Sequence, residues 1–317
     1  MSRSSHAPLR RCSVGAALLA AACATEGGSP TGVALPARFE ADRIFVDLPV
    51  AGRDDTLRLY TDTGGGLFVL GRAADRIGLA DSAGITLSAL APDFPDPRGA
   101  ENGRVPLLRP ERVPFDDLDG MLGQAWFADR VWSFDYPGQA LRLHPDGLPA
   151  ETLGARAELW FQRDSTGRRT LAFPRIQVAV DGEILDLLLD TGATLSLTES
   201  ALATLADGRP AVRATSFITS GVLAGWRRRH PDWRVVPDAD RSVPGMAMIE
   251  VPEVTIAGHA VGPVWFTERP DRNFREFMAQ WMDRPVEGAV GGNAFRFFVM
   301  TVDYPGAVAY FAPATAP

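Results

Sequence analysis

The 317-residue sequence contains no lysine, so all 32 of its basic residues are arginine. Against 39 aspartate and glutamate residues they leave a net charge of −7. A chain without a basic surplus is unlike a nucleic-acid-binding protein, whose surface must neutralise phosphates. With 46% hydrophobic residues, a chain of this length can bury one large core or two smaller ones. The length and composition therefore favour a globular protein with two domains or lobes.

Cysteine and histidine are also scarce. Both cysteines, Cys12 and Cys23, lie close to the N-terminus, so the sequence after residue 23 has no disulfide. The four histidines show no metal-ligand spacing, and the absence of a Gly-x-Ser-x-Gly motif argues against a serine hydrolase of that type. No apolar run after residue 23 approaches the ~18 residues of a membrane-spanning helix. We expect no metal and no cofactor. The histidines are His6, His144, His230 and His259.

The first 22 residues have the pattern of a secretory signal peptide. Arg3, Arg10 and Arg11 give the segment a positive start, and an apolar stretch over Cys12–Ala22 ends in small residues. Such a segment directs a bacterial protein out of the cytoplasm. We therefore expect residues 1–22 to be removed from the mature chain.

The next residue, Cys23, is a candidate for lipidation. Leu19–Cys23 resembles a bacterial lipobox, although Ala20 stands where leucine is usual. Residues 23–36, rich in glycine, serine, threonine and proline, would then form a flexible tether. This predicts a lipoprotein on the periplasmic side of the cell envelope, held to the membrane through Cys23 only. Plain secretion with cleavage nearby is the alternative.

The rest of the sequence contains an internal repeat. An apolar stretch ends in Asp62-Thr63-Gly64 in the first half and in Asp190-Thr191-Gly192 in the second. An alternating strand and a turn precede each stretch, and Asp181-Gly182 is the expected hairpin turn in the second copy. Two copies of one tripeptide in matching contexts indicate duplication.

The closing hairpins of the two halves also match. Residues 131–143 resemble residues 299–311, and both contain Asp-Tyr-Pro-Gly, beginning at Asp135 and Asp303. We expect these aspartates to form turns, with Pro-Gly in a type II turn. The predicted fold class is all-β, with two homologous barrel-like lobes and short helices. The N-terminal lobe would cover residues 37–146 and the C-terminal lobe residues 158–312, with the link over residues 145–157.

Short helices are expected after each triplet, over residues 71–77 and 198–205, with Thr198 as N-cap of the second. From the triplet to the Asp-Tyr-Pro-Gly turn the first half spans 73 residues and the second 113, so the second carries 40 more. Part of this excess is residues 226–245, whose Arg-Arg-Arg-His run we interpret as a solvated loop. Another part is residues 273–282, whose apolar face would cover its own lobe or form a lid or membrane-facing surface.

Two homologous lobes that each place an aspartate at the end of a strand can bring the two carboxylates together about a pseudo-twofold axis. Two such groups in contact do not both ionise, so Asp62 and Asp190 would share a proton. One is then a base and the other an acid, and together they can activate a water for attack on an amide. Gly64 and Gly192 allow a tight approach of the backbone.

The sequence resembles an aspartic protease of the pepsin and retropepsin superfamily over nearly all of residues 39–311. The resemblance rests on the two triplets and on two later apolar segments that end in glycine, Met121–Gly123 and Ala289–Gly291. It implies that Asp62 and Asp190 are catalytic, that Thr63 and Thr191 lock the lobes together, and that Gly64 and Gly192 support the site. The tandem arrangement resembles bacterial retropepsin-like proteins with two fused lobes.

Two features depart from the family pattern. Gly65 and Ala193 stand where pepsins carry serine or threonine, and only the alanine matches retropepsins. No flap tyrosine is evident, and the candidate flaps are residues 98–105, with Asn102-Gly103 as a hairpin tip, and residues 215–224. We expect a monomeric endopeptidase acting on peptides or proteins. A peptide-binding module of the cell envelope with weak or no catalysis is the alternative.

Overall fold

The structure is a computed structural model that describes Met1 and residues 32–79, 84–109, 117–147 and 154–314. The predicted signal peptide, Cys12, Cys23 and most of the predicted tether lie outside the described residues. The chain from Gly32 onward forms one compact unit. Among the described residues, no helix has the length and apolar character needed to cross a bilayer.

The first lobe is built on a seven-stranded sheet in the order β2-β3-β4-β8-β5-β7-β6. Three short helices and a 3-10 turn at Glu101–Gly103 accompany it. The strands are β2 Ala37–Glu40, β3 Arg43–Pro49, β4 Thr56–Thr61, β5 Phe68–Leu70, β6 Gly84–Ile85, β7 Val105–Leu108 and β8 Gly120–Leu122, and the helices are α1 Gly71–Arg76, α2 Leu87–Leu90 and α3 Gln124–Phe127.

The second lobe has a nine-stranded sheet in the order β17-β18-β21-β16-β22-β13-β12-β19-β20, and a separate pair of strands, β14 and β15. A π turn at Asn273–Phe277 and a 3-10 turn at Met278–Gln280 lie before β22. The strands are β12 Arg175–Val180, β13 Glu183–Leu189, β14 Thr194–Ser196, β15 Val212–Ala214, β16 Ser216–Thr219, β17 Val235–Val236, β18 Met248–Val251, β19 Val254–Ile256, β20 His259–Val261, β21 Val264–Arg269 and β22 Gly288–Val290, and the helices are α4 Glu199–Leu205, α5 Ser220–Arg229 and α6 Gly292–Phe295.

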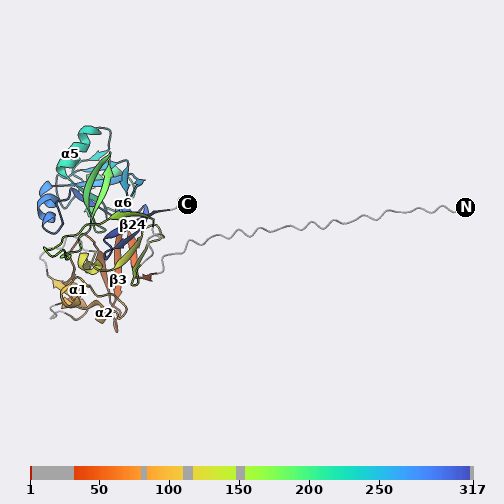
Figure 1. The fold of residues 1–317 in the computed structure, drawn as a ribbon, viewed down its shortest axis with the longest axis vertical. Coiled ribbons are helices and arrows are strands. Elements are labelled where there is room, and N and C mark those ends of the chain that lie inside the picture. Colours follow the sequence, from red (N-terminus) through yellow and green to blue (C-terminus); the bar gives the residue numbers. More distant parts are fainter. Residues whose placement is uncertain (2–31, 80–83, 110–116, 148–153, 315–317) are drawn as a thin grey trace. The chain divides into compact units, whose positions relative to one another are not determined.

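A six-stranded sheet shared by the two halves joins them, in the order β1-β10-β9-β23-β24-β11. The closing hairpins meet where β9 pairs antiparallel with β23. In Figure 1, α5 lies on one lobe and α1 on the other, with β24 between them. The strands are β1 Val33–Ala34, β9 Val131–Asp135, β10 Ala140–His144, β11 Ala155–Glu158, β23 Phe298–Asp303 and β24 Val308–Pro313.

This sheet corrects two predicted boundaries. Strand β1 lies within the predicted tether, yet it pairs with β10. Strand β11 begins within the predicted link and pairs with β24. Both segments satisfy their backbone hydrogen bonds in the folded unit, so the tether ends earlier than residue 36 and the link earlier than residue 157.

The all-β, two-lobed fold with short helices expected from the sequence is confirmed, and the two lobes have matching topology. In the first, β4 pairs parallel with β8 and β5 pairs antiparallel with β8. In the second, β13 pairs parallel with β22 and β16 pairs antiparallel with β22. The backbone N–H of Leu70 bonds the Asp119 carbonyl at 2.8 Å, and that of Thr219 bonds Glu287 at 2.9 Å. These residues therefore occupy equivalent places.

The equivalence corrects our pairing of the helices. Helix α1 follows β5, and the helix that follows the equivalent strand β16 is α5, not α4. From Asp62 to Leu70 there are 8 positions and from Asp190 to Thr219 there are 29, so the second lobe has 21 additional residues here. The backbone N–H of Thr215 bonds the Ala193 carbonyl at 2.9 Å and closes this insertion, residues 194–214. The insertion contains β14, α4 and β15.

Several local predictions are confirmed. Thr198 caps α4, because its side-chain oxygen accepts a bond from the Ala201 N–H at 3.2 Å. Asp181 and Gly182 turn the β12–β13 hairpin with φ of 52° and 75°. The Asp135 carboxylate accepts a bond from the Gly138 N–H at 2.7 Å, so this aspartate forms a turn as expected.

The predicted type II turn is wrong. The residue with positive φ in the first closing hairpin is Gln139, at 53°, and in the second it is Ala307, at 54°. A type II turn would place positive φ on the glycine itself. A Cβ on Gly138 or Gly306 would overlap the Asp135 or Asp303 carboxylate, so these glycines serve the close approach of the aspartate.

Residues 226–245 and 273–282 were assigned to the extra length of the second half. The first segment differs from the prediction, and the second largely follows it. The Arg-Arg-Arg run is the last turn of α5 and not a loop, and basic residues there complement the helix C-terminus. Phe274, Met278 and Met282 pack with Leu188 beneath them, so the apolar face of residues 273–282 covers its own lobe. Phe277, which we predicted on the same apolar face, is instead 59% exposed.

Candidate active site

The two triplets place their aspartates at equivalent strand ends. Asp62 follows β4, and its N–H bonds the Leu122 carbonyl at 3.0 Å. Asp190 follows β13, and its N–H bonds the Val290 carbonyl at 2.9 Å. Each carboxylate also accepts the N–H of its own triplet's glycine, at 3.0 Å from Gly64 to Asp62 and at 2.9 Å from Gly192 to Asp190. Each carboxyl group is therefore held by contacts within its own lobe.

The structure brings the two carboxyl groups together. A Cβ added to Gly64 would lie 2.7 Å from Cγ of Asp190, and one added to Gly192 would overlap Cγ of Asp62. Each glycine therefore lies directly against the carboxyl group of the other lobe. Asp190 is 8% exposed, whereas Asp62 is partly exposed. The absence of a side chain at both glycines is what permits this approach.

The two carboxyl groups differ in proton affinity. Burial, the negative charge of Asp190 and a hydrogen bond between the two groups raise the pKa of Asp62 well above its ordinary value. Burial also raises the pKa of Asp190, but a hydrogen bond from Asp62 and the N–H groups of Gly192, Ala193 and Gly64 oppose the rise. Both pKa values are raised, that of Asp62 further, so the surroundings favour a shared proton over two ionised carboxylates.

The threonines of the triplets bond across the lobe boundary. The Thr63 hydroxyl donates to the Leu189 carbonyl at 2.7 Å and accepts the Thr191 N–H at 2.9 Å. The Thr191 hydroxyl donates to the Thr61 carbonyl at 3.5 Å and accepts the Thr63 N–H at 3.2 Å. Both side chains are fully buried. The arrangement is reciprocal, with the shorter bonds on Thr63.

Tyr60 adds a cross-lobe contact that the sequence analysis missed. Its hydroxyl bonds the Gly192 carbonyl at 3.0 Å and the Thr194 hydroxyl at 2.6 Å. Its ring is 1% exposed and lies 5.1 Å from that of Phe45. The equivalent position in the second lobe is Leu188, which has no hydroxyl. A buried tyrosine hydroxyl usually has a polar partner, so a tyrosine two residues before the aspartate was the available signal.

Close backbone contacts support both loops from behind. The Gln124 N–H bonds the Gly65 carbonyl at 3.1 Å, and a Cβ on Gly123 would overlap Gly66. In the second lobe, a Cβ on Gly291 would overlap the Thr215 carbonyl. The glycines that end the two apolar segments thus allow the segments to pass close behind the two Asp-Thr-Gly loops.

The close packing around residue 65 explains why this residue is glycine. A Cβ at this position would overlap the Asp62 carboxylate, and the sulfur of Met121 would lie 2.8 Å away on the other side. In the second lobe Ala193 does carry a Cβ, and it is buried. The departure from the family pattern at residue 65 is therefore a consequence of how closely the Asp62 carboxylate lies to its own loop.

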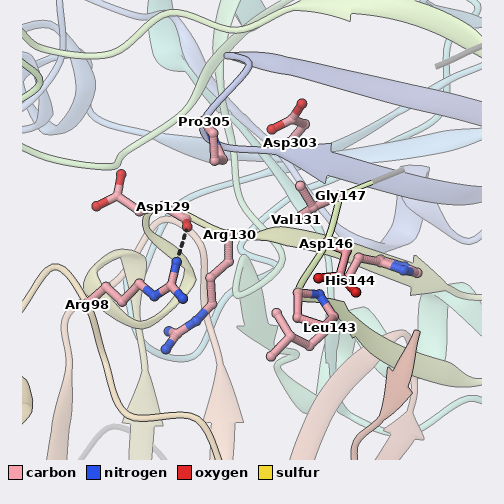
Figure 2. Close-up of a pocket in the computed structure, with 11 residues that line it drawn as sticks. Arg98, Asp129, Arg130, Val131, Leu143, His144, Asp146, Gly147, Asp303 and Pro305 are labelled. Atoms are coloured by element: carbon pink, nitrogen blue, oxygen red, sulfur yellow. Dashed lines mark hydrogen bonds between the residues drawn. The ribbon is translucent and has the colours of Figure 1, made fainter. Parts of the chain in front are cut away.

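Neither candidate flap is a hairpin. Residues 215–224 comprise β16 and the start of α5. Residues 98–105 include the 3-10 turn and lead into β7, while Arg98 donates to the Asp129 carbonyl at 2.9 Å. Arg98 also lines a pocket of about 720 Å³ with Arg130 and residues of the shared sheet (Figure 2). Asp303 lies across that pocket, and its role there is in the closing turn.

The comparisons by sequence find no match, and the similarity found is to a solved structure. No protein-family model matches the chain, and no curated protein matches it. Among solved structures, the chain is similar to the crystal structure of an aspartic proteinase from Irpex lacteus, at 11% identity and a TM-score of 0.49. The match covers 90% of this chain and 98% of that one.

Proposed function

We propose that the protein is an aspartic endopeptidase that hydrolyses peptide bonds with a water activated by Asp62 and Asp190. The observation that supports this most directly is that each triplet glycine lies against the carboxyl group of the opposite lobe. Two carboxyl groups of unequal pKa in contact are the requirement for combined acid and base catalysis.

The charges assign a role to each carboxyl group. Asp190, the charged member, takes a proton from the water as its oxygen attacks the amide carbon. Asp62, the protonated member, donates its proton to the carbonyl oxygen, which gives a neutral tetrahedral diol. Collapse of the diol returns a proton to Asp62 from one hydroxyl and transfers the proton held by Asp190 to the departing nitrogen. The pair then has its starting protonation.

A digest of a peptide library with the purified protein tests the proposal. We expect cleavage at mildly acidic pH that persists with chelators, is blocked by a statine-type inhibitor and is lost in Asp190→Asn. Asp303→Asn is the matched control, because Asp303 also ends a strand in the second lobe but forms only a turn. Cleavage that is unchanged in Asp190→Asn would refute the assignment. Peptide binding without cleavage by the unaltered protein would favour a binding module.

The finer classification is also a proposal. Ala193 follows the second triplet as in retropepsins, which supports the bacterial retropepsin-like subtype with fused lobes. Both aspartates come from one chain, so the pair forms without a second copy, and we propose a monomer. Size-exclusion chromatography with light scattering tests this, and a dimer at assay concentration would contradict it.

We further propose that the protein is exported and anchored on the periplasmic side through a lipid on Cys23. The sequence before residue 23 supports this, as does the start of the first strand at Val33, which leaves a short spacer. Mass spectrometry of the membrane fraction should find an acylated Cys23 as the N-terminal residue. The Cys23→Ser variant should lose the lipid, and an unmodified mature N-terminus in the unaltered protein would contradict the proposal.

A further inference from the structure

The insertion of the second lobe, residues 194–214, forms one wall of a pocket of about 220 Å³. Strands β18 and β21, helix α6 and its C-cap Arg296 contribute most of the remaining lining, with Thr215, Arg234 and Pro263. The pocket is tied to the Asp190 loop at two places. The insertion starts directly after Ala193, and the N–H of Gly291, behind that loop, donates to the Ser216 hydroxyl at 3.1 Å.

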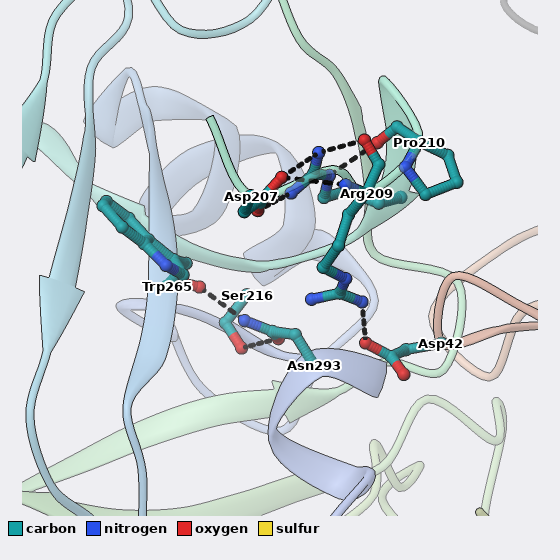
Figure 3. A network of polar contacts seen from close by, with 8 residues as sticks. Asp42, Asp207, Arg209, Pro210, Ser216, Trp265 and Asn293 are labelled. Carbon is teal, nitrogen blue, oxygen red and sulfur yellow. Dashed lines mark hydrogen bonds and ion pairs between the residues drawn. The ribbon is translucent and has the colours of Figure 1, made fainter. Parts of the chain in front are cut away.

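A set of buried polar contacts makes the pocket rigid. The Ser216 hydroxyl donates to Oδ1 of Asn293 at 2.8 Å, and Nδ2 of Asn293 donates to the Trp265 carbonyl at 2.7 Å. Figure 3 shows these contacts beside the arginines of the insertion. Ser216 is fully buried and Asn293 is 5% exposed. The pocket therefore exists before any ligand arrives.

Two of the four arginines that line the pocket have carboxylate partners. Arg213 is 5% exposed and contacts Asp207 through two nitrogens, at 2.5 and 3.2 Å. Arg209 contacts Asp42 of the first lobe at 2.5 Å (Figure 3). These two guanidinium groups are neutralised, and the second pair also joins the insertion to the other lobe.

The other two arginines lack such a partner. Arg234 donates to the Thr204 carbonyl at 2.7 Å and lies over the Trp265 ring at 5.7 Å. Within the described part of the chain, the Arg296 guanidinium makes no hydrogen bond or ion pair. Burial lowers the pKa of Arg296, and the charge of Asp42, whose hydrogen-bonded partner is Arg209, partly opposes the shift. A partly buried guanidinium without an acceptor is unfavourable unless a ligand supplies one.

The charged side chains of the pocket show how much negative charge a ligand would have to supply. After the two neutralised pairs are set aside, Arg234 and Arg296 face the single carboxylate of Glu250. One positive charge remains. A monoanion would balance it, whereas a phosphate dianion would exceed it. The floor of the pocket is apolar, with Leu195 and Met248 both buried.

We propose that this pocket binds the C-terminal carboxylate of a peptide whose last side chain is apolar. The planar guanidinium of Arg296 can hold a carboxylate through two parallel hydrogen bonds. The adjacent apolar floor would take the side chain. This rests on the proposed function only in naming a peptide as the ligand. The carboxylate site itself does not depend on catalysis.

Blocked single amino acids test the site without a peptide substrate for the aspartate pair. N-acetyl-leucine is titrated into the full-length protein and followed through the indole N–H signal of Trp265, with N-acetyl-leucinamide and inorganic phosphate as comparisons. We expect the acid to bind at least about tenfold more tightly than the amide, as for a charge-assisted bidentate pair. Equal affinities would overturn the proposal. Tighter binding of phosphate than of the acid would also overturn it and indicate a phosphate site.

Variants locate the binding. Arg296→Gln should weaken N-acetyl-leucine about tenfold, Arg296→Lys should weaken it less because the charge remains, and Glu250→Gln should strengthen it. Arg228→Gln, at an exposed arginine of α5, is the matched control and should leave affinity unchanged. Unchanged binding in Arg296→Gln would refute the assignment. Because Asp190→Asn should bind the probe normally, failure of the catalytic proposal remains distinguishable from failure of this one.

Discussion

The hydroxyl of Tyr60 gives the sharpest test of how the lobes are aligned. Tyr60→Phe keeps the ring against Phe45 and removes only the oxygen that bonds Gly192 and Thr194. The Gly192 carbonyl is then left without this donor next to the Asp62 carboxyl group. The substitution therefore perturbs the position of the catalytic loop and leaves its chemistry intact.

The size of the effect follows from the contacts. Loss of one partner from a buried hydrogen-bonded set costs about 1–3 kcal/mol. For a folded unit of this size, about 2 °C of melting temperature is lost per kcal/mol, so we expect a decrease of roughly 2–6 °C. A small displacement of one carboxyl group lowers kcat by about tenfold, because proton transfer depends steeply on geometry. We expect KM to change little.

Tyr136→Phe is the matched control, because the Tyr136 hydroxyl is buried and has no hydrogen-bond partner among the described residues. Removal of that hydroxyl should leave the melting temperature within about 1 °C. Differential scanning calorimetry and peptide cleavage on both variants test the argument. Equal melting temperatures and equal kcat for the two variants would refute the role given to Tyr60.

Three further predictions concern the triplet loops. The pKa of Asp62 is raised, so its contribution to stability is fully present below its unfolded-state pKa and is lost as pH rises through the folded-state pKa. The melting temperature of Asp62→Asn relative to that of the unaltered protein should therefore increase from pH 4 to pH 8. Parallel curves of melting temperature against pH for the two proteins would contradict this. Thr63→Val should destabilise more than Thr191→Val, by about 1 kcal/mol, because the bonds of Thr63 are shorter, and urea denaturation showing the reverse order would count against it. Gly65→Ala should abolish cleavage with the fold retained in circular dichroism, because its Cβ displaces the Asp62 carboxylate, whereas Ala193→Gly should cost stability by only about 0.5–1 kcal/mol.

The features that the sequence predicted well are those set by short-range rules. A strand followed by Asp-Thr-Gly, a hairpin at Asp181-Gly182 and an N-cap at Thr198 each depend on a few adjacent residues. Duplication then supplied the long-range information, because two equivalent strand ends imply a shared axis. The meeting of Asp62 and Asp190 was predictable for this reason, although they lie far apart in the sequence.

The features that were missed depend on pairing between distant strands. Helical periodicity at residues 198–205 resembles that at residues 71–77, and nothing local shows that α5 is the true equivalent of α1. Only the parallel and antiparallel partners of β16 establish it. The end of the tether was missed for the same reason, since Val33–Ala34 becomes a strand by pairing with β10.

Small differences between the two copies make the site asymmetric. Backbone N–H groups of Gly192, Ala193 and Gly64 lower the pKa of Asp190, whereas among the described residues Gly64 alone lowers that of Asp62 in this way. Donors favour the charged form, so the proposed mechanism gives the role of base to Asp190 and that of acid to Asp62. Tyr60 holds the carbonyl of Gly192 from the first lobe, and the leucine at the equivalent place in the second lobe makes no such bond. A duplicated fold thus provides two like groups, and in the proposed mechanism the unequal surroundings of the two loops determine which group is the acid and which the base.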